Sequence, residues 1–201
     1  MVRWVTTNKK IIEQIFLFLF IFLFGFTLLA LYSIVAGHPS QFFFYQFSRA
    51  AGQAAVIAFV LSITPGIARR FGIRNSVTTI LMLFRRQTGI LVFLFGLMHY
   101  IIIFMAPNIR AGEVPSDPPT YQIMGVLALY ALLPLFLTSN NRAVKKMGKW
   151  WQRLHRLVYV IAWLTFLHIA LVEINFWAVL IGIFAVLETV SLLYGAIKGR
   201  R

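Results

Sequence analysis

The chain has no cysteine and few acidic residues. Without a thiol it can form no disulfide, no cysteine-ligated iron–sulfur cluster and no thiol nucleophile, and the redox state of its compartment cannot be read from the sequence. Only 5 of the 201 residues are Asp or Glu, and 12% are charged, well below the share in soluble domains. In their place 60% of the residues are hydrophobic, including 20 Phe, and the mean hydropathy is +0.83. This composition predicts a membrane protein.

Apolar residues are concentrated in six runs, each able to supply the roughly 17–25 residues of a membrane-spanning helix. The runs cover residues 14–36, 51–67, 88–106, 121–138, 157–172 and 175–197. The first run is longer than the roughly 7–15 apolar residues of a cleaved signal peptide, so we expect it to be retained. We therefore expect an all-α membrane protein in which residues 1–201 form a single domain of six transmembrane helices.

Positive charge lies almost entirely on one side of the predicted membrane. The segments before the first run, between the second and third, between the fourth and fifth, and after the sixth hold 17 of the 19 Lys and Arg residues. Only Arg49 and Arg110 fall on the other side, beside Glu113, Asp117 and Glu173. The positive-inside rule then predicts that both termini are cytoplasmic. The net charge of +14 is thus a topology signal, with lipid and not nucleic acid as the partner.

Three of the four histidines belong to the apolar part of the chain: His99 and His168 lie within predicted runs, and His155 lies two residues before the fifth. A titratable ring is costly in hydrocarbon, so it indicates a site, and imidazole is a common ligand for metals and haem iron. His99 lies 13 residues after Arg86, and His168 lies 13 residues after His155. At about 1.5 Å per residue, both lie about 20 Å from the inner face. We expect His99 and His168 to hold one haem iron from both sides, which favours electron transfer over oxygen binding.

His155 has no histidine partner at its own level. The positions 13 and 14 residues before His99 are occupied by Arg86 and Arg85, so a second haem held by two histidines is not supported. On an ideal helix His155 also points about 140° away from His168. Its position alone leaves a cofactor role and a packing role equally open, and the two arginines are by position ordinary helix-end anchors.

Several polar residues near the ends of the predicted helices suggest further contacts. Ser139 is expected to cap a short basic helix that runs along the membrane surface to Lys149. Arg49, at the start of the second helix, suits an interfacial anchor or a partner for a haem propionate. Glu188, within the last helix, could pair with a basic residue or assist proton uptake by a quinone. The Trp-Trp pair at 150–151 is typical of the aromatic belt.

Four sequence blocks resemble the ferric-reductase-like transmembrane domain. They are Arg85-Arg86-Gln-Thr-Gly-Ile, Leu97-Met-His99-Tyr, Pro134-Leu-Phe-Leu-Thr-Ser139, and Met147-Gly-Lys-Trp-Trp-Gln-Arg-Leu-His155-Arg-Leu-Val-Tyr159, followed by His168. Within that family the similarity is to the haem-binding membrane subunits of bacterial methionine sulfoxide reductase systems. The block from Thr-Ser through Gly-Lys-x-Trp-x-x-Leu-His is the most specific, and the resemblance covers about residues 48–170.

The resemblance implies a subunit of the bacterial inner membrane that binds b-type haem and carries electrons. The donor would be a flavin such as FMN, or a quinone, on the cytoplasmic side. The acceptor would be a periplasmic molybdenum-cofactor reductase that repairs oxidised methionine. His99, His155 and His168 match the family's three functional histidines, and Arg85 and Arg86 match positions near a flavin phosphate or a haem propionate. Full ferric reductases carry two histidine pairs and a cytoplasmic FAD and nicotinamide domain; this sequence has neither, so a nicotinamide alone is not expected to reduce it.

Two alternatives differ from this primary hypothesis of an electron-transfer subunit. A free-standing ferric-reductase-like cytochrome acting on external metal or quinone would use the same chemistry. A small proton-coupled transporter or channel would use the histidines as a relay. The sequence shows no broken helix pair and no ring of acidic residues, the features on which such transporters and channels depend.

Overall fold

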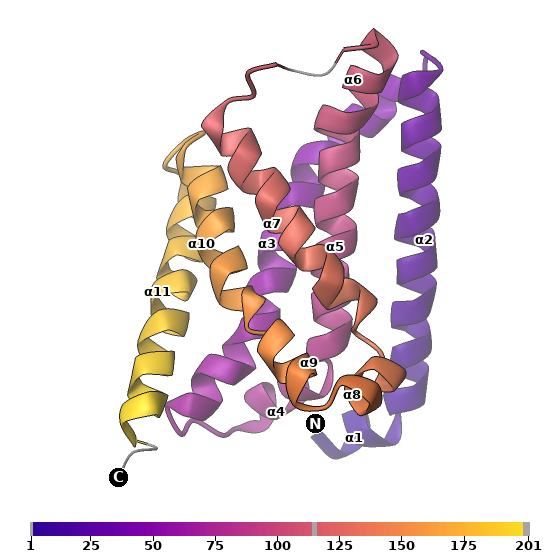
Figure 1. Ribbon diagram of the computed structural model, residues 1–201. Helices are drawn as coiled ribbons and strands as arrows, with labels where there is room; N and C mark the ends of the chain where they lie inside the picture. The colour runs from indigo at the N-terminus through magenta and orange to yellow at the C-terminus, as the bar shows by residue number, and fades with distance from the viewer. Residues whose placement is uncertain (1, 114–115, 199–201) are drawn as a thin grey trace.

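The computed structural model describes residues 2–113 and 116–198, and all regular secondary structure in these ranges is helical (Figure 1). The long helices are α2 (Lys9–Val35), α3 (Gln41–Arg70), α5 (Arg85–Tyr100), α7 (Thr120–Leu137), α10 (Leu157–Ala170) and α11 (Phe176–Lys198). The short helices are α1 (Val2–Thr7), α4 (Ser76–Leu83), α6 (Ala106–Ala111), α8 (Asn141–Met147) and α9 (Lys149–Leu154), and a π-helical turn, η1 (Ile101–Met105), joins α5 to α6. The prediction of an all-α protein is confirmed.

Five helical stretches in the described ranges are long and apolar enough to cross a membrane, which confirms a multi-pass membrane protein. They are Lys9–Val35, Gln41–Arg70, the continuous Arg85–Ala111, Thr120–Leu137 and Phe176–Gly195. The fifth predicted run forms α10, whose 14 residues give a length of about 21 Å, shorter than the roughly 30 Å of a hydrocarbon core. It is short because the chain turns at His155 and Arg156 between α9 and α10.

Helix α3 begins at Gln41, well before residue 51, where the sequence predicted its start. The aromatic residues 42–44 extend its apolar surface, and Pro65 lies within the helix without ending it. Membrane helices tolerate such a proline because neighbouring groups satisfy the freed backbone carbonyl. Arg49 therefore lies inside α3 and not at its start, which corrects the sequence prediction.

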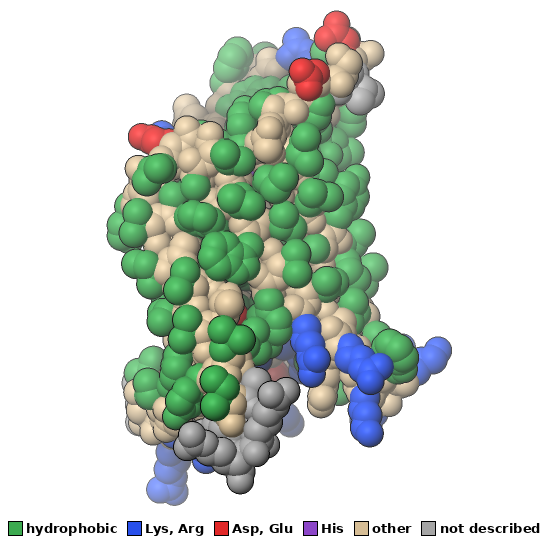
Figure 2. Space-filling view, turned by 60° about the vertical axis from the view of Figure 1, so that its left-hand side comes forward, with side chains coloured by type: hydrophobic (Ala, Val, Ile, Leu, Met, Phe, Trp, Pro, Cys, Tyr) green, Lys and Arg blue, Asp and Glu red, His purple; other side chains and the backbone are tan. Residues whose placement is uncertain are grey.

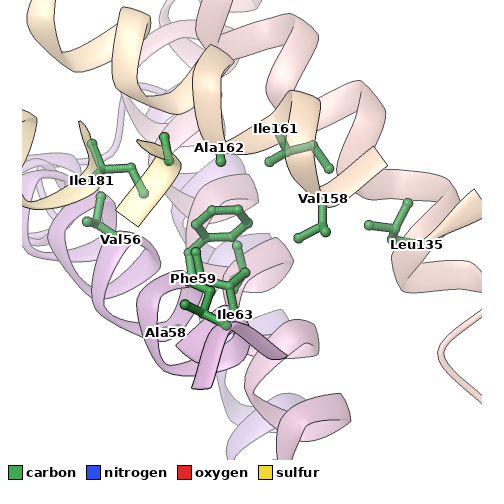
Figure 3. Packing of buried hydrophobic residues seen from close by; sticks show 12 residues of the cluster. Val56, Ala58, Phe59, Ile63, Leu135, Val158, Ile161, Ala162 and Ile181 are labelled. Carbon is green, nitrogen blue, oxygen red and sulfur yellow. The ribbon is translucent and has the colours of Figure 1, made fainter. Parts of the chain in front are cut away.

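Helix α3 lies at the centre of the bundle (Figure 1). It packs against α5 and α11, α10 packs against α7 and α11, and α2 packs against α5. The largest core cluster joins α3, α10 and α11 through side chains that are at most 2% exposed, among them Phe59, Ile63, Ile161, Ala162 and Ile181 (Figure 3). Because lipid chains are as apolar as these side chains, close packing holds the helices together here.

The two ends of the bundle differ in charge. Figure 2 shows a broad hydrophobic surface between Lys and Arg side chains at one end and mainly Asp and Glu side chains at the other. The end that holds α1, α4, α8, α9 and the last described turn of α11 is called the basic end below (Figure 1). The loops 36–40, 112–113 and 171–175 lie at the opposite end.

The basic segment after α7 is capped by Asn140 and not by Ser139. The Asn140 Oδ1 accepts a backbone N–H of the first turn of α8 at 2.8 Å, whereas the Ser139 hydroxyl donates to a carbonyl of α7 at 2.6 Å. The single helix expected through Lys149 is also wrong, because Gly148 adopts a φ of +51°, which favours glycine and separates α8 from α9. Helix α9 returns to the end of α7, where Trp151 Nε1 donates to a backbone carbonyl at 3.0 Å.

Candidate cofactor site

His99 on α5 and His168 on α10 bring their rings together inside the bundle. The ring centroids lie 6.4 Å apart, and the ring planes meet at 73°. A metal–imidazole bond is about 2 Å long and the ring centre lies about 1 Å behind the nitrogen, so rings on opposite sides of one metal have centroids about 6 Å apart. The spacing therefore fits one metal ion between the two imidazoles.

Each ring is oriented by a hydrogen bond to the backbone of a neighbouring helix. His99 Nδ1 donates to the Ser48 carbonyl on α3 at 2.8 Å, and His168 Nδ1 donates to the Tyr121 carbonyl on α7 at 2.7 Å. Because a carbonyl can only accept, each neutral ring carries its proton on Nδ1 and leaves the Nε2 lone pair for a metal. Such bonds fix the orientation of a ligand ring and raise its basicity.

Two glycines give the rings access to these carbonyls. Gly52 and Gly125 each lie four residues after the residue whose carbonyl accepts the bond. A Cβ at Gly125 would lie 2.7 Å from His168 Nδ1, and one at Gly52 would lie 3.2 Å from His99 Nδ1. Sequence reasoning missed both. The one signal in the sequence is the presence of a glycine within an apolar helix. Because glycine lowers helix stability, its presence there indicates a position that a neighbouring group approaches closely.

His155 occupies the turn between α9 and α10 at the basic end. Its ring stacks on the ring of Trp151, with centroids 4.0 Å apart. The sequence had suggested only an aromatic-belt position for Trp151. Its Nε2 lies 3.2 Å from the Thr138 hydroxyl, which donates to the Pro134 carbonyl at 2.6 Å and so accepts from Nε2–H. Burial, together with the Arg85 cation, lowers the pKa of His155 to about 4, which keeps the ring neutral at pH 7. His99 and His168 form their hydrogen bonds through Nδ1, whereas His155 uses its Nε2 in the hydrogen bond to Thr138.

Glu188 on α11 pairs with Arg70 at the end of α3. The two guanidinium nitrogens Nη1 and Nη2 donate to Oε2 and Oε1 at 3.0 Å each. The hydroxyls of Ser191 and Tyr159 accept further hydrogen bonds from the same guanidinium. Glu188 is 1% exposed, so this fork-like pair is how a carboxylate is held in the bundle interior. The sequence left two roles open for Glu188, pairing with a basic residue and assisting proton uptake by a quinone. In the structure Glu188 pairs with the basic residue Arg70.

A second guanidinium lies in the same region without a carboxylate of its own. A Cβ at Gly66 would lie 3.6 Å from Arg70 Nη2 and 3.7 Å from Arg85 Nη1, so the two cations sit against one glycine. Within the described residues the Arg85 side chain makes no hydrogen bond or ion pair. Two cations thus share the carboxylate of Glu188, and the surplus positive charge favours an anionic ligand.

The other two predicted arginines lie at the surface. Arg86 is exposed, and its Nη1 donates to Asn141 Oδ1 at 2.6 Å, which ties the start of α5 to α8. Arg49 is exposed on α3, next to Ser48, and has no hydrogen bond or ion pair to the described part of the chain. Neither side chain joins Arg85 in the interior.

The protein alone offers an incomplete set of metal ligands. Within the described ranges no three His, Asp or Glu side chains gather at one point. Two imidazoles are the set of protein ligands that a haem iron can take, because the porphyrin brings four pyrrole nitrogens of its own.

The long apolar helices define an integral, multi-pass membrane protein. Residues 51–166 match the family described as ferric reductase like transmembrane component. Because the match covers more than half of the chain, the protein belongs to that family, which confirms the resemblance found in the sequence.

Curated relatives carry the name protein-methionine-sulfoxide reductase heme-binding subunit MsrQ. The protein from Brucella anthropi is 39% identical over 80 residues, which are 38% of this chain and 36% of that protein. The protein from Brucella ovis is 35% identical over 91 residues, which are 44% of this chain and 41% of that protein. The chain thus spans about two fifths of the length of these relatives. No solved structure matches it significantly.

The buried ion pair predicts a strong effect of losing Glu188. We expect Glu188→Ala to lower the free energy of unfolding by about 3 kcal/mol, because Arg70 and Arg85 then lack any carboxylate in the interior. Denaturant titration in detergent micelles, followed by circular dichroism, measures this loss. The control is Glu13→Ala, which removes a half-exposed contact to Lys9 at 3.7 Å and a long hydrogen bond from Gln87 Nε2 at 3.4 Å, each worth at most about 1 kcal/mol. Equal loss in the two variants would contradict this role of Glu188.

Proposed function

We propose that this protein is the electron-carrying b-type cytochrome subunit of a methionine sulfoxide reductase system in the bacterial inner membrane. It would pass electrons from a flavin or quinone on the cytoplasmic side to a periplasmic molybdenum-cofactor reductase. The observation that carries the proposal is the ring pair of His99 and His168, 6.4 Å apart and each held through Nδ1. Membership of the ferric-reductase-like family and the similarity to relatives named heme-binding subunits support it.

His99 and His168 are the proposed axial ligands of one haem b. Haem held by two imidazoles would supply one-electron transfer and not oxygen binding. The carbonyls of Ser48 and Tyr121 keep each imidazole in one tautomer and one orientation, which limits the rearrangement that accompanies a change of charge. Arg49, exposed beside Ser48, is proposed to pair with a propionate at the same level.

The basic end is the proposed donor side. The surplus charge at Arg85 suits the phosphate of FMN, a propionate or the oxygen of a reduced quinone, since a guanidinium binds such oxygens through paired hydrogen bonds. The stacked rings of Trp151 and His155 lie at the same end, and they are proposed as the contact to the donor or to a second cofactor. Arg86, through its hydrogen bond to Asn141, would hold α8 against the start of α5 on this side.

We also propose six membrane crossings with both termini in the cytoplasm. Helix α10 follows α9 at the basic end and leads to the loop 171–175 at the opposite end, so it connects the two charged ends as the longer helices do (Figure 1). An even number of crossings agrees with α1 and the end of α11 lying together at the basic end. That end carries the Lys and Arg residues, which the positive-inside rule assigns to the cytoplasm.

Reconstitution with a periplasmic reductase tests the proposed function. We expect chemically reduced haem in vesicles to be reoxidised when the reductase and methionine sulfoxide are both added, and to stay reduced with the sulfoxide alone. His99→Ala and His168→Ala should lose most of the haem absorption and therefore this reoxidation. The matched control is His38→Ala, since His38 is exposed at the opposite end. Reoxidation by a ferric chelate but never through the reductase would favour the free-standing cytochrome instead.

The glycine contacts predict an order of effects on the cofactor. Gly125→Ala should bind the least haem, Gly52→Ala more, and Gly89→Ala as much as the wild type, because a Cβ at Gly89 meets nothing within 4 Å. Haem that Gly125→Ala retains should have a more positive midpoint potential, since a lost Nδ1 bond makes the ligand less basic and destabilises the ferric form. Haem content and redox titration measure both effects. Equal haem content and potential in Gly125→Ala and Gly89→Ala would exclude this positioning role.

A further inference from the structure

A groove of about 580 Å³ opens at the basic end, apart from the histidines and from Arg85. Its walls come from α1, the end of α3, the turn that follows it, and α4. Val5, Pro65 and Leu83 contribute apolar surface, and Arg69 and Arg74 contribute the charges. The volume lies within the range of roughly 300–1,000 Å³ that small-molecule sites occupy.

The two arginines of the groove have no counter-ion among the residues that the structure describes. Both side chains are exposed, and neither makes a hydrogen bond or ion pair to the described residues. The sequence has five carboxylate side chains, and three of them, at 113, 117 and 173, belong to the loops of the opposite end. The other two are engaged at the basic end, Glu13 by Lys9 and Glu188 by Arg70. Among the described residues no carboxylate pairs with Arg69 or Arg74, so the pair can accept an external anion.

The donors of the groove are the two guanidinium groups. The Thr78 hydroxyl is used in the cap of α4, where it accepts from the Asn75 N–H and donates to the Asn75 carbonyl. The Thr79 hydroxyl donates to that same carbonyl at 2.8 Å. The groove therefore offers charge without a set of neutral donors, which suits a compact anion such as a phosphate diester.

The apolar walls indicate that this anion belongs to an amphiphile. Large hydrophobic side chains stand exposed around the groove: Ile73 is 53% exposed in its wall, and Trp4 and Val77, beside lining residues, are 66% and 56% exposed. A free phosphate would leave this surface in water, whereas a phospholipid covers it with its acyl chains. Basic pockets of this kind on the cytoplasmic side of membrane proteins bind anionic lipid headgroups.

We propose that this groove is a binding site for one anionic phospholipid, with its phosphate between Arg69 and Arg74 and its chains against the apolar wall. The site is independent of the proposed haem, because no lining residue takes part in the histidine pair or the Arg70–Glu188 pair. Its occupant would anchor α1 and α4 to the end of α3 at the membrane surface.

Native mass spectrometry of the detergent-solubilised protein tests this site. We expect the first molecule of phosphatidylglycerol to bind more tightly than phosphatidylcholine, and an excess of inorganic phosphate to leave it bound. The double variant Arg69→Gln/Arg74→Gln should bind that first phosphatidylglycerol about 30-fold more weakly, the loss expected for two interfacial charges. Arg69→Lys/Arg74→Lys should keep most of the preference.

The matched control is Arg142→Gln/Lys145→Gln, which removes the same charge from exposed positions on α8 at the same end. It should bind phosphatidylglycerol as the wild type does. Equal weakening in the two double variants would show a general surface charge effect and overturn the site. Displacement of the lipid by inorganic phosphate, or equal binding of both lipids by the wild type, would also overturn it. An unchanged circular dichroism spectrum establishes that the variants are folded.

Discussion

Two hydrogen bonds from imidazole Nδ1 to helix carbonyls determine the arrangement of the proposed cofactor site. A ring bonded through Nε2 would turn its metal-binding nitrogen toward the helix and leave no ligand pair. Each bond requires two helices in close contact, α3 with α5 for His99 and α7 with α10 for His168. Each bond also requires a glycine at the helix contact. The packing of the four helices and the positions of the two metal-binding nitrogens therefore depend on each other.

The basic end carries most of the charged groups of the described structure, besides the stacked rings of Trp151 and His155. In the interior, two guanidinium groups share one carboxylate, and the bidentate pair of Arg70 and Glu188 leaves Arg85 as surplus. At the surface, Arg69 and Arg74 pair with no carboxylate in the described part of the chain. The ring pair in the bundle and the basic end therefore suit different tasks: ligation of a metal by neutral imidazoles, and recognition of anions by guanidinium groups.

Composition and hydropathy were sufficient to predict the helical class and the membrane, because each depends on many residues at once. The family followed from the four sequence blocks that resemble it. The common level of His99 and His168 followed from the regular rise of a helix. The carbonyls that orient them could not be predicted, since every backbone carbonyl of a neighbouring helix is chemically alike until the packing is known. Glu188 and Arg70 lie 118 residues apart, so their pairing left no local pattern. Ser139 does not cap α8 because the neighbouring Asn140, a residue type that caps helices equally well, occupies the N-cap position.

Electron paramagnetic resonance of the oxidised, haem-loaded protein tests ligation by both histidines most directly. Two imidazole ligands give a low-spin ferric haem, and ring planes that meet at 73° give the strongly anisotropic signal of nearly perpendicular ligands. We predict that signal as the dominant species. A high-spin axial signal, as a single histidine ligand produces, would contradict the assignment of His99 and His168 as the two ligands of one haem.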